Sequence, residues 1–161
     1  SSGIGVPAVA RFGVDFAGVV EAVGSAVQGY APGDAVFGAA SGAFAEYIVV
    51  RPARIAKKPA DLAFADAAAM PVAAVTALQA LRDKAGVQPG QRVLVNGASG
   101  GVGTYAVQIA KALGAEVTGV CSARNVELVR GLGADHVIDY GVVDFTTAGV
   151  RYDAIIDLVG N

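Results

Sequence analysis

The sequence predicts an α/β fold, in which a parallel β-sheet covered by helices is preceded by a region of short β-strands. From about residue 91 onward, apolar strands alternate with helical patterns, which is typical of a parallel sheet. Before about residue 60, short apolar runs are separated by glycine-containing turns, which is typical of a β-barrel or β-sandwich. We therefore expect a β-region over residues 1–65, and connecting helices followed by the α/β region over residues 66–161.

The β-region is predicted from apolar runs that are too short for helices. The runs predict strands over residues 16–24, 35–38 and 42–50. A turn is expected at Pro32-Gly33-Asp34, because proline presets φ and glycine tolerates a positive φ.

The α/β region follows a helical segment over residues 66–84, which is rich in alanine and leucine. Pro71 is expected to begin a second helix within it, since proline is favoured in the first helical turn. The expected strands lie over residues 92–95, 116–121, 136–139 and 152–158, and the expected helices over residues 101–113 and 125–131.

Composition excludes several classes of function. Hydrophobic residues make up 54% of the 161 residues and charged residues 16%, so a substantial core is expected. The net charge is −2 and the longest basic run is Lys57-Lys58, so the footprint of a nucleic-acid partner is absent. Cys121 is the only cysteine, which excludes an intrachain disulfide and a cysteine-rich zinc site.

A membrane span is not expected. The one candidate, residues 62–81, contains Asp66 and Pro71 and is mostly alanine, so we interpret it as a buried helical segment. No N-terminal signal segment is visible, and we expect a soluble, cytoplasmic protein.

The segment "NGASGGVG" at residues 96–103 carries the strongest functional signal. A turn without side chains lets a pyrophosphate approach the backbone, and the helix that follows offers free N–H groups. Two glycine registers fit, one beginning at Gly97 and one at Ala98, and both contain Gly100 and Gly103. The turn lies between a strand and a helix, with a second strand ending about 20 residues later, as a dinucleotide-binding unit requires. The alternative is a tight β–α turn that holds no ligand.

The end of the second strand indicates which dinucleotide would bind. Sites for NADH place an acidic residue there, whereas a 2′-phosphate requires that acid to be absent and a cation to be near. In this sequence Cys121 and Ser122 stand at that position, and Arg124 follows. A hydroxyl can donate and a guanidinium can bind phosphate oxygens, so NADPH is favoured over NADH. The alternative is that Arg124 merely lies in the first turn of a solvated helix.

With both regions in view, the chain resembles the medium-chain dehydrogenase/reductase superfamily, and within it the zinc-independent quinone-oxidoreductase branch. The matching segments occur in the order of the family and are "GVDFAGVVEAVGSAV", "GDAVFG", "GAFAEYIVV", "AAAMPVAAVTALQAL", "GASGGVGTYAVQIAKALGAEV", "LGADHVIDY" and "YDAIIDLVG". The resemblance implies part of a GroES-like β-domain followed by the first strands of a Rossmann domain, with the cofactor in the cleft between them.

The resemblance also implies which residues hold the cofactor, while catalytic residues stay unknown. The matching positions are Thr76, Gly100, Gly101, Val102, Gly103, Ser122, Arg124 and Tyr140. One departure is that many relatives have a lysine where this sequence has Asn125. Arg124 would then have to reach the phosphate from one residue earlier.

Two related dehydrogenase classes fit less well. Zinc-dependent members carry Gly-His-Glu where this chain has Gly13-Val14-Asp15, and valine cannot ligate a metal. His136, the only histidine, is interpreted as structural, because a metal or acid–base site needs partners that it lacks. Short-chain dehydrogenases need tyrosine followed four residues later by lysine, and none of the five tyrosines meets this condition.

The resemblance implies hydride transfer from NADPH to a quinone or an α,β-unsaturated carbonyl compound, without a metal. It further implies a small-molecule substrate and a homodimer in the full-length protein, of which this chain resembles a fragment. Two alternatives stay open, namely an NADPH-binding protein without turnover and an enoyl-reductase segment of a larger synthase.

Overall fold

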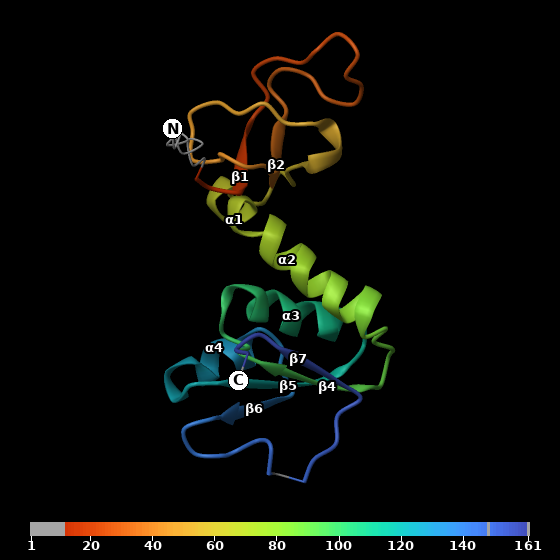
Figure 1. Ribbon diagram of the computed structural model, residues 1–161, viewed down its shortest axis with the longest axis vertical. Helices are drawn as coiled ribbons and strands as arrows, with labels where there is room; N and C mark the ends of the chain where they lie inside the picture. Colours follow the sequence, from red (N-terminus) through yellow and green to blue (C-terminus); the bar gives the residue numbers. More distant parts are fainter. Residues whose placement is uncertain (1–11, 148, 161) are drawn as a thin grey trace, which may run out of the picture. The chain divides into compact units, whose positions relative to one another are not determined.

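The computed structural model describes residues 12–147 and 149–160, which form two compact units. The N-terminal unit ends at Val72 and the C-terminal unit begins at Ala73. Each contains one sheet, antiparallel in the first and parallel in the second, so the expected fold class is confirmed (Figure 1). The expected domain boundary at residue 65 stays a prediction.

The sheet of the N-terminal unit has the order β1-β2-β3 and is antiparallel throughout. Its strands are β1 (Asp15–Val19), β2 (Ala35–Ala39) and β3 (Ile55–Lys57), which follows a short 3-10 helix, η1 (Pro52–Arg54). The turn before β2 is confirmed, because the Asp34 N–H donates to the Ala31 carbonyl at 3.1 Å and Gly33 has φ of +91°. That geometry, with proline second and glycine third, is a type II turn.

Two predictions for the N-terminal unit are wrong. The first strand ends at Val19 instead of residue 24, and residues 42–50 form a turn, bends and irregular backbone without a strand. A strand needs a neighbouring strand for its N–H and C=O groups, and no strand among the described residues pairs with the segment over residues 42–50. Its first N–H groups reach neighbouring backbone, where those of Gly42 and Ala43 donate to the Gly13 carbonyl. Strand β3 was not predicted, because three residues are too few for a periodic pattern.

Helices α1 (Phe64–Ala69) and α2 (Pro71–Leu78) follow, and α2 continues into a π-helical turn, η2 (Gln79–Lys84). Pro71 begins α2 as expected, and the Asp15 carboxylate accepts a hydrogen bond from the Val72 N–H at 2.9 Å. The expected burial of this segment is wrong, because only Ala67, Ala77 and Leu81 are buried. No helix in the described part of the chain has both the length and the apolar character that a membrane crossing needs.

The parallel sheet of the C-terminal unit has the order β6-β5-β4-β7. Its elements are β4 (Arg92–Asn96), α3 (Gly101–Ala112), β5 (Glu116–Cys121), η3 (Ala123–Asn125), α4 (Val126–Gly131), β6 (His136–Asp139) and β7 (Ala154–Asp157). Helix α3 packs on β4 and β5, and α4 packs on β5 and β6. Strands β5 and β6 have the predicted bounds.

The core of the C-terminal unit lies around the two central strands. Val93, Leu94 and Val95 of β4 are fully buried, and Val117 and Val120 of β5 are as well. A strand with both faces covered reads as a continuous apolar run, which is why "RVLV" predicted it. Strands β4, β5 and β6 follow one another in one direction across the sheet, and β7 then pairs with the other side of β4. The direction of strand order therefore reverses beside β4. The carboxyl ends of β4 and β7 therefore flank the crevice where open parallel sheets bind ligands.

Candidate functional site

The glycine turn between β4 and α3 is fixed to the neighbouring strand. The N–H groups of Gly97 and Ala98 both donate to the Val120 carbonyl, at 3.2 and 2.9 Å. Gly97 has φ of +81°, a conformation that residues with a Cβ rarely adopt. The turn closes with a 3.0 Å hydrogen bond from the Gly100 N–H to the Gly97 carbonyl. Hydrogen bonds within the chain thus fix the path of the backbone through the turn.

The glycines of the turn differ in whether packing requires a residue without a side chain. A Cβ on Gly103 would lie 2.1 Å from the Gly97 carbonyl oxygen, so only glycine lets α3 pack this closely on the turn. A Cβ on Gly101 would meet no atom within 4 Å, and one on Gly100 would lie 3.3 Å from the Gly97 oxygen. Packing therefore accounts for Gly103 and leaves Gly101 unexplained. Both Gly100 and Gly101 are exposed.

The open side of the turn presents hydrogen-bond donors. The N-cap residue of α3 is Gly100, which has no side chain to accept hydrogen bonds from the first turn. The first hydrogen bond of the helix runs from the Thr104 N–H to the Gly100 carbonyl at 2.9 Å. The N–H groups of Gly101, Val102 and Gly103 precede it and lie at the positive end of a twelve-residue helix. An open backbone with free N–H groups fits the pyrophosphate of a dinucleotide.

Ser122 and Arg124 follow β5, where the sequence predicted the recognition of a 2′-phosphate. Ser122 is partly buried at the N-cap of η3, and Arg124 is exposed and forms no ion pair within the described residues. Asn125, which sequence analysis did not assign to the site, links this loop to the glycine turn. Its Nδ2 donates to Ser99 Oγ at 3.0 Å and to Ser122 Oγ at 3.3 Å.

Tyr140 and Thr76 lie at different places in the unit. Tyr140 follows β6 directly, and its N–H donates to the carbonyl of Cys121 at 3.1 Å, which places it beside the end of β5. Its side chain is exposed. Thr76 lies on α2 and is exposed. The structure thus gathers the turn, Ser122, Arg124 and Tyr140 at one edge of the sheet and leaves Thr76 outside that group.

A buried amide and a carboxylate mark the crevice between β4 and β7. Asn96 Nδ2 donates to Asp157 Oδ1 at 2.9 Å, and that oxygen also accepts the N–H of Val159 at 3.1 Å and of Gly160 at 3.4 Å. These donors, the Val159 N–H above all, hold the pKa of Asp157 below its usual value. The carboxylate thereby fixes the segment after β7 beside Gly97, whose Cβ would lie 3.1 Å from Val159.

Other reactive side chains do not form a catalytic set. Cys121 is buried as predicted, and burial, followed by the charge of Asp139, raises the pKa of its thiol. His136 begins β6 and is exposed, with Nε2 3.1 Å from Glu116 Oε1. Val14 is exposed. Within the described residues, no three histidine, cysteine or acidic side chains gather as a metal site requires.

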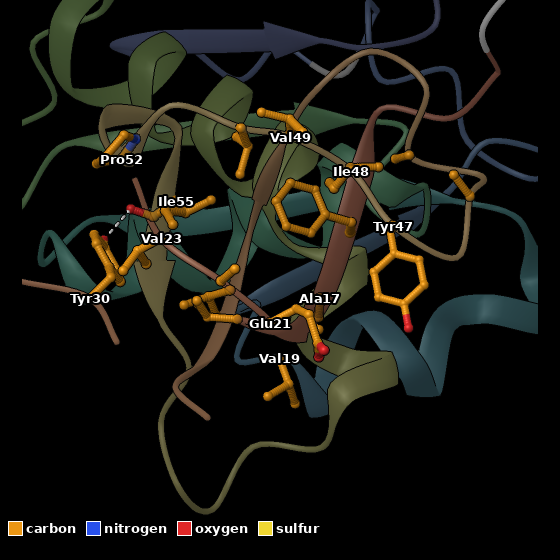
Figure 2. A pocket seen from close by; sticks show the side chains of 18 of the residues that line it. Ala17, Val19, Glu21, Val23, Tyr30, Tyr47, Ile48, Val49, Pro52 and Ile55 are labelled. Atoms are coloured by element: carbon orange, nitrogen blue, oxygen red, sulfur yellow. Dashed lines mark hydrogen bonds between the residues drawn. The ribbon is translucent and has the colours of Figure 1, made fainter. Parts of the chain in front are cut away.

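The N-terminal unit contains a separate hollow of about 560 Å³, lined by β1, the loop after it and residues 43–50. Figure 2 shows its lining, which is mostly aliphatic and aromatic. The Tyr30 hydroxyl is already engaged, because it donates to the Ile55 carbonyl at 2.9 Å. Glu21 and Tyr47 are exposed. The hollow has the apolar character of a ligand site but lacks the convergent polar groups that fix a substrate.

Two family models match the chain. An alcohol dehydrogenase GroES-like domain matches residues 2–60, and a zinc-binding dehydrogenase domain matches residues 101–161. The chain is 44% identical over 155 residues to a chloroplast envelope quinone oxidoreductase homolog of Arabidopsis thaliana, covering 88% of this chain and 47% of that protein. It is 43% identical over 159 residues to a mitochondrial NAD(P)H oxidoreductase of Mus musculus, covering 92% of this chain and 40% of that protein.

Further similarity extends to a synthase and to a solved structure. A component of the pikromycin polyketide synthase of Streptomyces venezuelae is 44% identical over 144 residues, which are 88% of this chain and 4% of that protein. The quinone oxidoreductase structure from Coxiella burnetii superposes with a TM-score of 0.85 at 41% identity, covering 92% of this chain and 49% of that one. The chain thus spans about half, 47%, of the length of the Arabidopsis thaliana relative.

Proposed function

Since this chain belongs to the medium-chain dehydrogenase/reductase superfamily, in its quinone-oxidoreductase-like branch, we propose that the protein is an NADPH-dependent oxidoreductase. The acceptor is a quinone or an α,β-unsaturated carbonyl compound. The observation that carries the proposal is the glycine turn, because its open glycine and three free N–H groups fit a pyrophosphate while the helix behind it is packed tightly.

The chain's own residues bind and orient the cofactor. The N–H groups of residues 101–103 would hold the pyrophosphate, and Ser122 with Arg124 would bind the 2′-phosphate, with Tyr140 beside them. NADPH, when bound, supplies the hydride, so the protein needs to orient it and exclude water. Thr76 is proposed at the nicotinamide end from the family resemblance alone.

We propose that the reaction proceeds without zinc. Val14 occupies the position where zinc-dependent members have histidine, and its alkyl side chain has no metal-binding atom. Asp15, at the position of their glutamate, is engaged in the hydrogen bond to the backbone of α2. The complete protein should keep its full activity after dialysis against a chelator. A loss of activity that added zinc restores would contradict the proposal.

The choice between NADPH and NADH rests on Arg124. Arg124→Ala should weaken NADPH binding roughly tenfold, because a hydrogen-bonded charge contributes about 1.5 kcal/mol or more, and should leave NADH binding nearly unchanged. Arg130→Ala is the matched control, since that exposed arginine pairs with Glu127 on α4. Equal losses for both cofactors in the Arg124 variant would show that this residue does not recognise the 2′-phosphate.

The acceptor is tested with the complete protein. NADPH oxidation should be followed at 340 nm with a panel of quinones, enones and an enoyl thioester. Turnover with quinones or enones supports the proposal, whereas turnover confined to the thioester would favour an enoyl reductase like those of the synthases. NADPH binding without turnover of any acceptor would instead indicate a protein that only binds the cofactor.

We propose two further properties of the complete protein, namely that it is a homodimer, as the resemblance implies, and that it is cytoplasmic. Sedimentation equilibrium of the complete protein should give twice the mass of one chain. A single-chain mass at micromolar concentration would contradict the dimer. Fractionation of the producing cells should recover the protein with the cytoplasmic fraction.

A further inference from the structure

Asn125 connects the two loops that would hold the cofactor. Its side-chain Nδ2 lies 3.0 Å from Ser99 Oγ, in the glycine turn after β4, and 3.3 Å from Ser122 Oγ, at the end of β5. The short helix η3 makes this possible, because the Asn125 N–H donates to the Ser122 carbonyl at 2.9 Å and folds the chain back. Asn125 and both serines are partly buried, so the contacts lie inside the loop pair.

The hydrogen-bond inventory of these three groups decides what they can offer to a ligand. An amide Nδ2 carries two hydrogens, and each is directed to one serine oxygen. Each hydroxyl therefore accepts from Asn125 and keeps its own hydrogen for another partner. Within the described part of the chain, neither hydroxyl donates that hydrogen to a protein acceptor. The arrangement thus leaves two donors for an anion, and no acceptor competes for them.

We propose that Asn125 is a positioning residue for recognition of the cofactor's 2′-phosphate. It acts by holding Ser122 in place as a hydrogen-bond donor and by linking Ser122 to Ser99. The proposal rests on the proposed function. Arg124 supplies the positive charge, and the neutral amide acts only through the serines. A phosphate oxygen accepts such hydrogen bonds more strongly than a ribose hydroxyl does, because it is charged. Asn125 therefore contributes to the preference for NADPH and little to the binding of NADH.

The experiment measures cofactor affinity in Asn125→Leu, which keeps the branched shape of the side chain and removes both donors. Fluorescence titrations of the complete protein with NADPH and NADH are paired with calorimetric titrations of adenosine 2′,5′-bisphosphate and 5′-AMP. NADPH and the bisphosphate should bind roughly tenfold more weakly, as expected for loss of a hydrogen bond to a charged group. NADH and 5′-AMP should change by less than about twofold. Gln108→Leu is the control, since it removes an exposed amide from the middle of α3.

A double-mutant cycle tests whether Asn125 acts through Ser122. If it does, Ser122→Ala in the Asn125→Leu background weakens NADPH binding far less than it does in the wild type. Independent, multiplying losses would overturn the positioning role. Equal losses for NADPH and NADH in Asn125→Leu would also overturn it, because they would indicate a general effect on the loop.

The outcomes separate the two proposals. A complete wild-type protein that binds neither cofactor overturns the proposed function, and the positioning role with it. A wild-type chain that prefers NADPH, with an Asn125→Leu variant that keeps the same preference, overturns the positioning role alone. If thermal unfolding shows that the leucine variant does not fold, Asn125→Asp replaces it. That variant cannot donate and places a negative charge near the phosphate, so an unchanged preference for NADPH would overturn the proposal.

Discussion

The two units bury their strands to very different extents. In the C-terminal unit, Val93, Leu94 and Val95 of β4 are fully buried, whereas in the N-terminal unit Val19 of β1 is 59% exposed. Val49, which lies outside the strands of that unit, is fully exposed. Within the described residues of the N-terminal unit, the buried hydrophobic side chains are Val36 and Ala67. Because burial of apolar area is the main stabilising contribution, the parallel sheet should supply most of the chain's free energy of unfolding.

This difference in burial predicts that the largest loss of stability follows substitution of a glycine in the C-terminal unit. Gly103→Val would place a Cβ about where the Gly97 carbonyl lies, 2.1 Å away, so α3 must move off the turn. We expect a loss of about 3 kcal/mol or more in the free energy of unfolding, measured by urea titration. The matched control in the N-terminal unit is Gly18→Val, because a Cβ on Gly18 meets no atom within 4 Å. Equal losses in the two variants would contradict the contrast.

The next effect, of overlapping size, is expected from shortening a core side chain. Leu94→Ala should destabilise the chain by about 2–5 kcal/mol, since it leaves a cavity in the central strand. Val49→Ala should change stability by less than about 0.5 kcal/mol, because that side chain has no cover. A loss of similar size at Val49 would show that the N-terminal unit is packed more tightly than its exposure indicates.

The smallest effect is the pH dependence that comes from Asp157. Its pKa is lowered in the folded chain by the Val159 N–H, the Asn96 amide and the Gly160 N–H. The ionised carboxylate therefore stabilises the fold above the pKa of the unfolded chain, and this contribution is lost as the pH falls below that value. Thermal unfolding of Asp157→Asn should accordingly depend less on pH between about 5 and 2 than that of the wild type. Identical pH profiles would show that the carboxylate does not stabilise the crevice.

Sequence analysis predicted the parallel sheet closely and the antiparallel sheet poorly, for one physical reason. Strand β5 carries its signal locally, because a strand covered on both faces must be apolar along its length. The segment over residues 42–50 alternates like a strand, yet a strand also needs a neighbour, and the sequence does not show whether one is present.

The site was predicted in part. The glycine turn could be found because its spacing is local, but Gly101 and Gly103 could not be told apart. Their roles depend on which side of α3 meets the turn. The contact between Asn125 and Ser99 was missed, because the two residues are 26 positions apart in the sequence. The available signal was a polar residue three positions after Ser122, where a short helix brings side chains back toward its start.

The most direct test of the central claim, that the glycine turn binds NADPH, compares the wild-type chain with Gly101→Val. Fluorescence titration with NADPH should show binding to the wild type and none to the variant, because the new side chain occupies the open face that the pyrophosphate needs. Urea unfolding should show equal stability, since the Cβ meets no protein atom within 4 Å. Unchanged NADPH affinity in a folded Gly101→Val chain would contradict the account.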